Sequence, residues 1–316
     1  MAFDVLRCSV GMKRDNRVLM TDRTTPIGEG LSREQRYLAK SVLAMFPRSW
    51  QRARRRIVVL CYHSVHPTNA FASATPEQFD EQMGWLKEHC DVIPLGEALD
   101  RVAERRDSPS KPAVSITFDD GYDDNFVFAL PVLMRYGIKA SFYVTTGFID
   151  RDPEVVDRMR RMRGMAVSAL RWEQLAEMRR GGMAVGSHTI THPNLAELAP
   201  GAVRAELRDS KRALEDHLGE EIDSIAYPYG IPGRHVTDQT IASAREAGFR
   251  TGVSILYRDI RQRDDALNIP RIAVKNNSLQ LLKAKIVGSL DVIGRWQEYK
   301  ARGTIAADDD GGTKTG

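Results

Sequence analysis

Between Ile57 and Val274 the sequence alternates short apolar runs with longer amphipathic segments. The apolar runs have the length of strands, and the segments between them carry apolar residues at helical spacing. Strand–helix alternation of this extent implies parallel strands joined by helical crossovers. We therefore expect an α/β fold, either a barrel or an open doubly wound sheet, with strands at 57–62, 113–118, 140–145, 183–186, 224–227, 251–254 and 269–274.

Helices are expected between these strands. Thr75 followed by Pro76 combines a side-chain acceptor with the fixed φ angle that favours a helix start. Further helices are predicted at 125–136, 172–180, 202–218 and 237–247. The segment 150–165 is rich in Arg and Met. It is interpreted as a solvated covering helix, with a flexible wall over a binding groove as the alternative.

The length of 316 residues suits one α/β domain with appendages. We expect a leader at 1–56, a main domain at 57–290 and a C-terminal extension at 291–316, whose tail after Gly303 is predicted to be disordered. A net charge of +4, with 7% aromatic residues and no basic–aromatic repeat, argues against nucleic-acid binding. The three cysteines show no C-x-x-C spacing, which indicates a reducing compartment.

The sequence shows neither a secretory signal nor an apolar run long enough to span a membrane. A cytoplasmic protein is therefore expected. The segment 34–56 mixes apolar side chains with many Arg residues. A solvated helix docked on the domain is the favoured interpretation. Peripheral contact with the inner membrane face is the alternative.

Two adjacent carboxylates, Asp119 and Asp120, follow the apolar run 113–118. Successive side chains of a strand point to opposite faces, so one site can use both acids only where the strand stops. Gly121 permits that stop, because glycine adopts backbone angles closed to other residues. Taken alone, such a triplet is equally typical of a turn or a helix cap.

Two histidines, His188 and His192, lie four positions apart just after the expected strand 183–186. One carboxylate and two imidazoles suit a divalent first-row metal with an open coordination position. The second carboxylate is then free for proton transfer. Because sites of parallel α/β folds form at the carboxyl ends of strands, the two fragments are predicted to meet in a metal-dependent hydrolase site.

Three elements in this order resemble the motifs of the NodB-type polysaccharide deacetylases, carbohydrate esterase family 4. They are Thr117-Phe118-Asp119-Asp120-Gly121, His188-Thr189-Ile190-Thr191-His192 and Tyr227-Pro228-Tyr229-Gly230. The resemblance covers about residues 57–288. It implies a distorted barrel of the (β/α)7 type and removal of an N-acetyl, occasionally an O-acetyl, group from a sugar such as N-acetylglucosamine.

The resemblance also implies roles for individual residues. By motif position, Asp120, His188 and His192 are expected to hold the metal, and Asp119 to act as general base. Zinc is the expected ion, with cobalt or nickel as alternatives. The expected groove residues are Tyr227, Pro228 and Tyr229, with the backbone N–H of Tyr229 stabilising an oxyanion.

The sequence departs from the family pattern at the general acid. Many members use a late His, whereas here no His follows His235. Tyr62-His63, at the end of the first expected strand, resembles the Y-H element of a subgroup that includes bacterial poly-N-acetylglucosamine deacetylases. His63 is therefore the expected acid, with a structural strand-end His as the alternative.

A second departure concerns an Arg that is often found in the groove loop of the family and pairs with the catalytic carboxylate. The loop here begins Ala226-Tyr227-Pro228 and lacks it. Arg271 is expected to serve instead, as part of the groove, and to keep Asp119 ionised by lowering its pKa. A surface salt bridge is the alternative. Structural or exposed roles are expected for His66, His89, His217 and His235.

Other functions stay open. An O-acetyl esterase or a cyclic-amide hydrolase could use the same barrel. A non-haem iron oxygenase also uses two His and one carboxylate, but those sites usually occur in all-β folds. A catalytically inactive carbohydrate-binding barrel would have no need of Asp119 as a spare base. The favoured partner is an N-acetylated saccharide or glycoconjugate.

Overall fold

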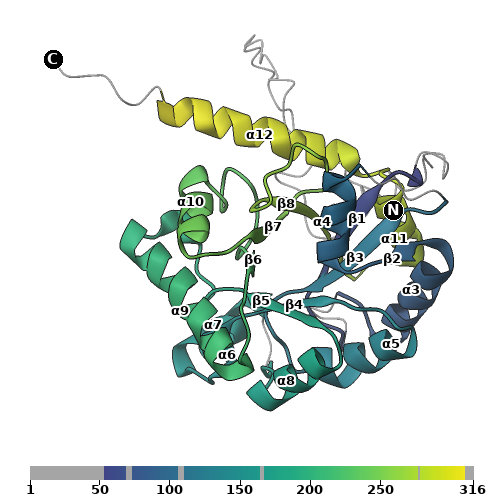
Figure 1. Ribbon diagram of the computed structural model, residues 1–316, viewed down its shortest axis with the longest axis horizontal. Helices are drawn as coiled ribbons and strands as arrows, with labels where there is room; N and C mark the ends of the chain where they lie inside the picture. Colours follow the sequence, from purple (N-terminus) through teal and green to yellow (C-terminus); the bar gives the residue numbers. More distant parts are fainter. Residues whose placement is uncertain (1–52, 69–72, 106–109, 164–166, 277, 310–316) are drawn as a thin grey trace, which may run out of the picture. The chain divides into compact units, whose positions relative to one another are not determined.

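In the computed structural model, seven parallel strands close into a barrel (Figure 1). The structure describes residues 53–68, 73–105, 110–163, 167–276 and 278–309. Each strand of the ring pairs with its neighbours, and β8 pairs back with β1. The ring consists of β1 (Ile57–Tyr62), β3 (Ala113–Phe118), β4 (Ser141–Val144), β5 (Ala184–Ser187), β6 (Ser224–Ala226), β7 (Thr251–Ile255) and β8 (Ile269–Ala273). The predicted strands are confirmed, and ring closure selects the barrel over the open sheet.

The register of the ring brings distant parts of the chain to the same level. Tyr62 at the end of β1 is paired with Phe118 at the end of β3, so His63 and Asp119 leave the barrel side by side. A short strand, β2 (Asp91–Val92), pairs with the start of β3, whereas β4 pairs with its end. Parallel pairing around the ring therefore gathers the strand ends at one rim.

Helices surround the ring in Figure 1. They are α3 (Pro76–His89), α4 (Leu95–Ala103), α5 (Leu130–Arg135), α6 (Thr146–Ile149), α7 (Pro153–Arg163), α8 (Trp172–Arg180), α9 (Pro200–Leu218), α10 (Asp238–Glu246), α11 (Leu279–Ile286) and α12 (Asp291–Asp309). The predicted start of α3 is confirmed, because the Thr75 side chain accepts a hydrogen bond from the backbone N–H of Gln78 at 3.2 Å. A capped first turn satisfies a donor that the helix leaves unpaired.

The predicted helix 125–136 consists of two parts, a π-helical turn η1 (Asn125–Ala129) and α5. The Arg- and Met-rich segment forms α7, which buries Val155 and Met159. Four helices were not predicted from the sequence: α4, α6, α11 and α12. A single-turn 3₁₀ helix, η2 (Leu195–Glu197), precedes α9.

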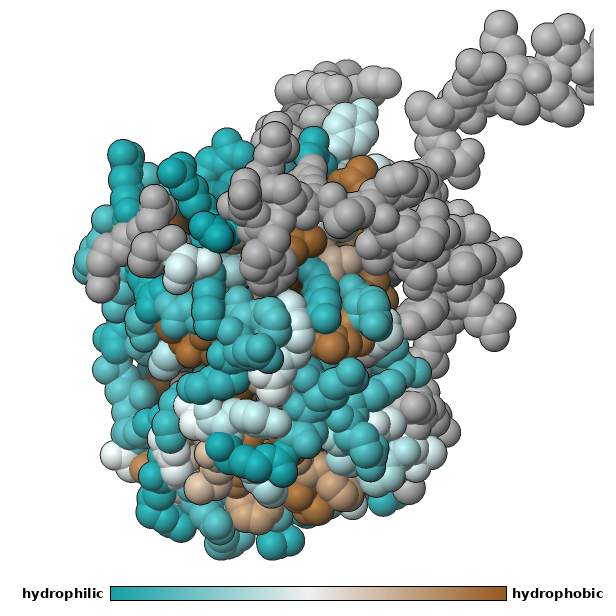
Figure 2. Space-filling model, turned by 90° about the vertical axis from the view of Figure 1, so that its right-hand side faces the viewer, coloured by the Kyte–Doolittle hydropathy of each residue, from teal (hydrophilic) through white to brown (hydrophobic). Residues whose placement is uncertain are grey.

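Side chains of the strands alternate between the helix layer and the barrel interior. On β1, Leu60 and Tyr62 belong to the large apolar cluster that includes Phe79 of α3. The side chain of Cys61, which lies between them in the sequence, faces the barrel interior instead. Polar groups also lie there, and Arg271 donates to the hydroxyl of Thr117 at 3.1 Å. Among the residues drawn in colour in Figure 2, hydrophilic ones cover most of the visible surface, and hydrophobic ones form small groups.

The chain segments that flank the barrel are joined by a buried ion pair. Arg56 donates to both carboxylate oxygens of Asp291 at 2.7 and 2.9 Å. The segment 34–56, predicted as an amphipathic helix, lies outside the described residues except for 53–56. Helix α12 continues to Asp309, so the tail expected to be disordered after Gly303 starts within a helix, and residues 310–316 lie outside the described part. Among the described helices, none has both the length and the apolar character needed to cross a membrane.

Candidate metal and catalytic centre

The two adjacent carboxylates sit where β3 stops. The backbone N–H of Asp119 still donates to the carbonyl of Tyr62 at 3.0 Å, as a strand residue would. Asp120 and Gly121 then turn into the left-handed region, with φ angles of 78° and 85°. A side chain at Gly121 would place its Cβ 3.1 Å from the Cβ of Val144. The predicted stop at glycine is confirmed, and close packing as well as backbone freedom requires it.

Asp120, His188 and His192 converge as the sequence predicts. The Oδ1 atom of Asp120 lies 3.4 Å from the Nε2 atoms of both histidines. All three side chains are buried, and Asp120 Oδ1 has no hydrogen-bond partner within the described part of the chain. An unpaired buried carboxylate oxygen facing two imidazole nitrogens is unfavourable unless a cation lies between them.

The orientation of His188 supports such a cation. Its Nδ1 atom lies 2.6 Å from the backbone carbonyl of Ala226, to which it donates, so in the neutral ring Nε2 carries a lone pair. A metal-ligating His commonly donates its second ring nitrogen in this way. One carboxylate oxygen and two Nε2 atoms are three ligands with positions left open, which fits a divalent metal ion. Asp120, His188 and His192 would hold that ion.

The loop between the two histidines is held by groups that no sequence motif indicates. Glu206 of α9 accepts hydrogen bonds from the backbone N–H groups of Ile190 and Thr191 at 2.8 and 3.0 Å. The backbone N–H of Gly147 in α6 donates to the carbonyl of Ile190 at 3.0 Å. These contacts fix the loop from two helices far apart in the sequence.

Left-handed backbone angles gather at the site. Asp120, Thr189, His192 and Tyr229 all have positive φ, between 54° and 78°. Such angles are uncommon for residues with a side chain and cost on the order of 1–3 kcal/mol each, so they persist only where surrounding contacts enforce them. The three sequence motifs therefore share strained backbone as well as reactive side chains.

Asp119 is paired with Arg271, as the sequence predicts. The guanidinium donates to both carboxylate oxygens, NH1 to Oδ1 at 2.6 Å and NH2 to Oδ2 at 2.7 Å. Burial alone would raise the pKa of Asp119, but the charge of Arg271 lowers it to about 2. Arg271 is fully buried, so its prediction as a groove residue is wrong. Its role is to hold Asp119 ionised, since a bidentate pair is among the strongest polar contacts.

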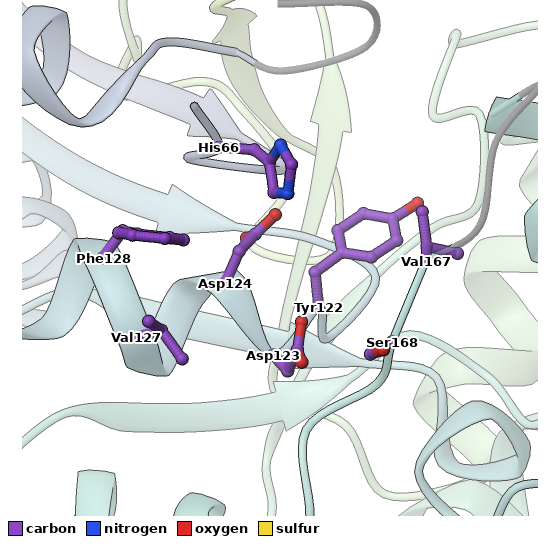
Figure 3. Close-up of a pocket in the computed structure, with 8 residues that line it drawn as sticks. All are labelled: His66, Tyr122, Asp123, Asp124, Val127, Phe128, Val167 and Ser168. Atoms are coloured by element: carbon purple, nitrogen blue, oxygen red, sulfur yellow. The ribbon is translucent and has the colours of Figure 1, made fainter. Parts of the chain in front are cut away.

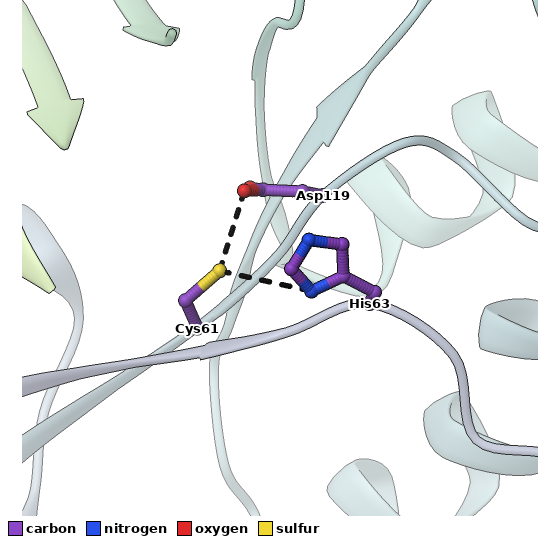
Figure 4. Close-up of side chains that lie close together, drawn as sticks. All are labelled: Cys61, His63 and Asp119. Atoms are coloured by element: carbon purple, nitrogen blue, oxygen red, sulfur yellow. Dashed lines mark hydrogen bonds between the residues drawn. The ribbon is translucent and has the colours of Figure 1, made fainter. Parts of the chain in front are cut away.

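His63 and Cys61 lie beside Asp119, and Figure 4 shows the three side chains facing one another. The thiol of Cys61 donates to Asp119 Oδ2 at 3.3 Å and lies 4.0 Å from His63 Nδ1. The backbone carbonyl of His63 accepts from the Asn125 amide at 2.9 Å. His63 thus lies close to Asp119, and its role as the general acid stays a prediction. Cys61 was missed, because a Cys in an apolar strand resembles any core residue.

The environment of His63 sets a condition on its expected role. Burial lowers the pKa of His63 to about 4, although the charges of Asp120 and Asp119 oppose this shift. The ring is therefore neutral near pH 7 with the charges that the chain provides. To act as an acid, it must first receive a proton during turnover.

The Pro-containing loop contributes one side chain to the site. Tyr229 is 45% exposed, and its ring centroid lies 5.0 Å from that of His192. Tyr227 is instead buried, and its hydroxyl donates to the carbonyl of Leu267 at 2.9 Å. The prediction that Tyr227 lines the groove is therefore wrong. The roles of Pro228 and of the Tyr229 backbone N–H stay predictions.

A pocket of about 300 Å³ opens next to the centre (Figure 3). It is lined by His66, Tyr122, Asp123, Asp124, Val127, Phe128, Val167 and Ser168. Within its wall the buried Asp124 accepts from the hydroxyl of Ser64 and, at 3.3 Å, from the backbone N–H of Val65. Asp124 thus ties η1 to the segment that carries His63.

The contribution of the buried Asp124 to the stability of the fold should fall as the pH rises. Burial raises the pKa of Asp124 to about 7, although hydrogen bonds from Ser64 and Val65 oppose the shift. A folded-state pKa above the unfolded value means that the stabilisation is complete below about pH 4 and is lost as the pH rises through about 7. Asp124→Asn keeps the shape and cannot ionise. Between pH 4 and pH 8 the wild type should therefore lose about 2–4 kcal/mol of unfolding free energy relative to Asp124→Asn.

Urea unfolding at several pH values measures this difference. Asp157→Asn, at an exposed position on α7, serves as the control and should follow the wild type at every pH. A difference between wild type and Asp124→Asn that does not change with pH would contradict the prediction.

The remaining histidines have the structural or exposed positions expected of them. His89 and His217 make ring contacts with Trp85 and Trp172, at centroid distances of 4.7 and 3.8 Å. His235 lies against the Tyr229 ring at 5.3 Å. His66 lies on the pocket wall.

Comparison with known proteins agrees with this geometry. Residues 106–252 match the family model described as polysaccharide deacetylase. Over 201 residues the chain is 29% identical to YxkH of Bacillus subtilis, a protein named for the same family, covering 63% of this chain and 64% of that protein. It is 23% identical over 220 residues to a poly-beta-1,6-N-acetyl-D-glucosamine N-deacetylase of Staphylococcus aureus, covering 66% and 70%. This chain thus matches slightly less than two thirds of the length of YxkH.

Two solved structures share the fold over most of this chain. The deacetylase PplD of Streptococcus pyogenes, in complex with acetate, is 26% identical with a TM-score of 0.62, covering 73% of this chain and 98% of that one. IcaB of Ammonifex degensii is 30% identical with a TM-score of 0.61, covering 74% and 97%. The predicted fold and the resemblance are confirmed: the chain belongs to the polysaccharide deacetylase family.

Proposed function

We propose that this protein is a metal-dependent carbohydrate de-N-acetylase. The observation that carries the proposal is the division of labour between the adjacent carboxylates. Asp120 Oδ1 faces His188 and His192 at 3.4 Å, whereas both oxygens of Asp119 are held by Arg271. One carboxylate is thus arranged as a metal ligand. The other stays ionised beside the site, where it can accept a proton.

The reaction requires three contributions. A bound divalent ion would polarise the acetyl carbonyl and lower the pKa of water, which an unreactive amide needs. Asp119 accepts the proton of the attacking water at a carboxylate oxygen. His63 gives a proton to the departing sugar nitrogen. Because its pKa is lowered to about 4, the imidazole must take up, within the same turnover, the proton that Asp119 accepts from the attacking water.

The substrate class is proposed from the relatives. One matched relative is named for the N-deacetylation of poly-beta-1,6-N-acetyl-D-glucosamine. We propose an N-acetylglucosamine-containing saccharide or glycoconjugate for this chain as well, with zinc as the first candidate ion. The cytoplasmic location and the membrane contact of 34–56 stay predictions, since residues 1–52 lie outside the described part.

The function is tested by incubating the metal-loaded protein with β-1,6-linked N-acetylglucosamine oligomers and following the loss of acetyl groups by mass spectrometry. His188→Ala should lose both bound metal and turnover, because it removes one of three protein ligands. His217→Ala, which removes a histidine stacked on Trp172 away from the centre, is the matched control and should keep both. Normal metal content and turnover in His188→Ala would refute the assignment of the site.

The role of His63 is tested by the choice of leaving group. His63→Ala should keep its metal and lose activity on an N-acetyl sugar, because the amine cannot depart without a proton. On an activated aryl acetate ester the loss should be much smaller, since that leaving group departs unprotonated. The measurement compares kcat/KM for both substrates. Equal losses on amide and ester would indicate that His63 is structural.

A further inference from the structure

We propose that Arg163 is a positioning residue that restricts Asp120 to a single metal-binding oxygen. The inference rests on the metal site of the proposed function and extends it to α7, whose role the sequence leaves open. The guanidinium of Arg163 donates to Oδ2 of Asp120 and to the hydroxyl of Tyr122. Oδ1, the other oxygen of Asp120, is the one that faces His188 and His192.

The position of Arg163 is fixed by packing. Val155 and Met159, on the buried side of α7, form a small apolar cluster with Tyr122 and Phe148. The Arg163 guanidinium also lies over the Tyr122 ring, 5.1 Å from its centroid. Tyr122 lies two residues after Asp120 in the sequence. Tyr122 therefore packs against α7 and also accepts a hydrogen bond from Arg163, the last residue of that helix. Helix α7 therefore delivers one cation to one carboxylate oxygen.

Two consequences follow for a bound metal. With Oδ2 engaged by Arg163, Asp120 contributes one ligand atom instead of two, which leaves a coordination position open for water or the substrate carbonyl. The positive charge of Arg163 also reduces the negative charge that Asp120 offers the ion. Arg163 would therefore weaken the binding of the ion and leave it a stronger Lewis acid.

A second role follows from burial. Asp120 is fully buried, and burial alone would disfavour its ionised form. The guanidinium of Arg163, which donates to Oδ2 of Asp120, places a positive charge directly beside this carboxylate. Arg163 therefore compensates the carboxylate charge before a metal binds. Without Arg163, the metal would be the main compensating charge, and metal binding would stabilise the fold more strongly.

The test is metal binding by the full-length protein and its Arg163→Met variant, independent of any sugar substrate. In a zinc competition titration, Arg163→Met should bind about tenfold more tightly, because the variant removes a nearby positive charge that repels the ion. Its Tm in EDTA should fall, and the rise in Tm on adding Zn²⁺ should exceed that of the wild type. With Co²⁺ alone, its visible absorption should weaken, because a two-oxygen Asp120 raises the coordination number.

Two variants separate charge from packing. Arg160→Met makes the same chemical change at an exposed position of α7 and should match the wild type in every measurement. Arg163→Lys retains the charge and should bring the zinc affinity back toward the wild-type value. Unchanged or weaker zinc binding by Arg163→Met, or an unchanged Co²⁺ spectrum, would overturn the proposal. Failure of the protein to deacetylate while zinc binds at Asp120 would count against the proposed function instead.

Discussion

Asp119→Asn is expected to bind metal normally and to lose about 10²–10⁴-fold in kcat, the usual contribution of a general base. The reason is geometric: Asp119 Oδ1 and Oδ2 are held by Arg271 at 2.6 and 2.7 Å, whereas the predicted ligand atoms belong to Asp120, His188 and His192. The substitution removes the proton acceptor and leaves the ligands in place. Metal content and kcat measured on the same preparation check it.

The matched control is Asp123→Asn, which changes an aspartate on the pocket wall four residues further along the chain. It should keep metal and retain most of the turnover. Loss of metal by Asp119→Asn would mean that the two carboxylates share the ligand role. The assignment of base and ligand would then have to be revised.

The largest effect on stability is expected at Arg271. Arg271→Met leaves the Asp119 carboxylate buried without its partner, which typically costs about 3–5 kcal/mol of unfolding free energy. Arg250→Met also removes an Arg that pairs with carboxylates, but this Arg is 63% exposed. It should cost far less, because solvent screens such pairs. Urea unfolding of both variants near pH 7 measures the contrast.

The loss of unfolding free energy in Arg271→Met is also expected to depend on pH. In the wild type the pKa of Asp119 is lowered to about 2, so its stabilisation is present above about pH 4 and is lost as the pH falls toward 2. In Arg271→Met, the buried Asp119 has lost its cationic partner, so its pKa is raised. As the pH falls, Asp119 becomes protonated and the variant loses the unpaired buried charge that destabilises it. The stability gap should narrow at acidic pH. The double variant Asp119→Asn/Arg271→Met should lose less than the sum of the single losses. A gap that is constant with pH would contradict this account.

The sequence by itself determined the α/β class, the positions of the barrel strands and which residues converge at the candidate metal site. Apolar runs of strand length can be recognised locally, because burial of both faces leaves no polar alternation. Asp119-Asp120-Gly121 could be placed at a strand end, because both acids can serve one site only there. The pairing of Asp119 with Arg271 was predicted from the resemblance, and the structure confirms it at 2.6 and 2.7 Å.

The tertiary structure alone decided how these residues are supported. Elements far apart in the chain supply hydrogen-bond partners to the site. These partners are Glu206, Cys61 and Arg163. A Glu on an amphipathic helix or an Arg in an Arg-rich segment has no local signal that distinguishes it from a solvated residue.

Burial was the second property that the sequence could not settle. Tyr227 and Tyr229 belong to one loop motif. Tyr227 is buried, whereas Tyr229 is partly exposed beside His192. The backbone leaves the extended conformation at Tyr229, where φ is 61°. The motifs predict which residue types come together. The residue types follow from the ligands that a metal ion needs, and their common position follows from the strand ends that they occupy. Which neighbour orients each ligand depends on packing between distant elements, and only closure of the barrel determines that packing.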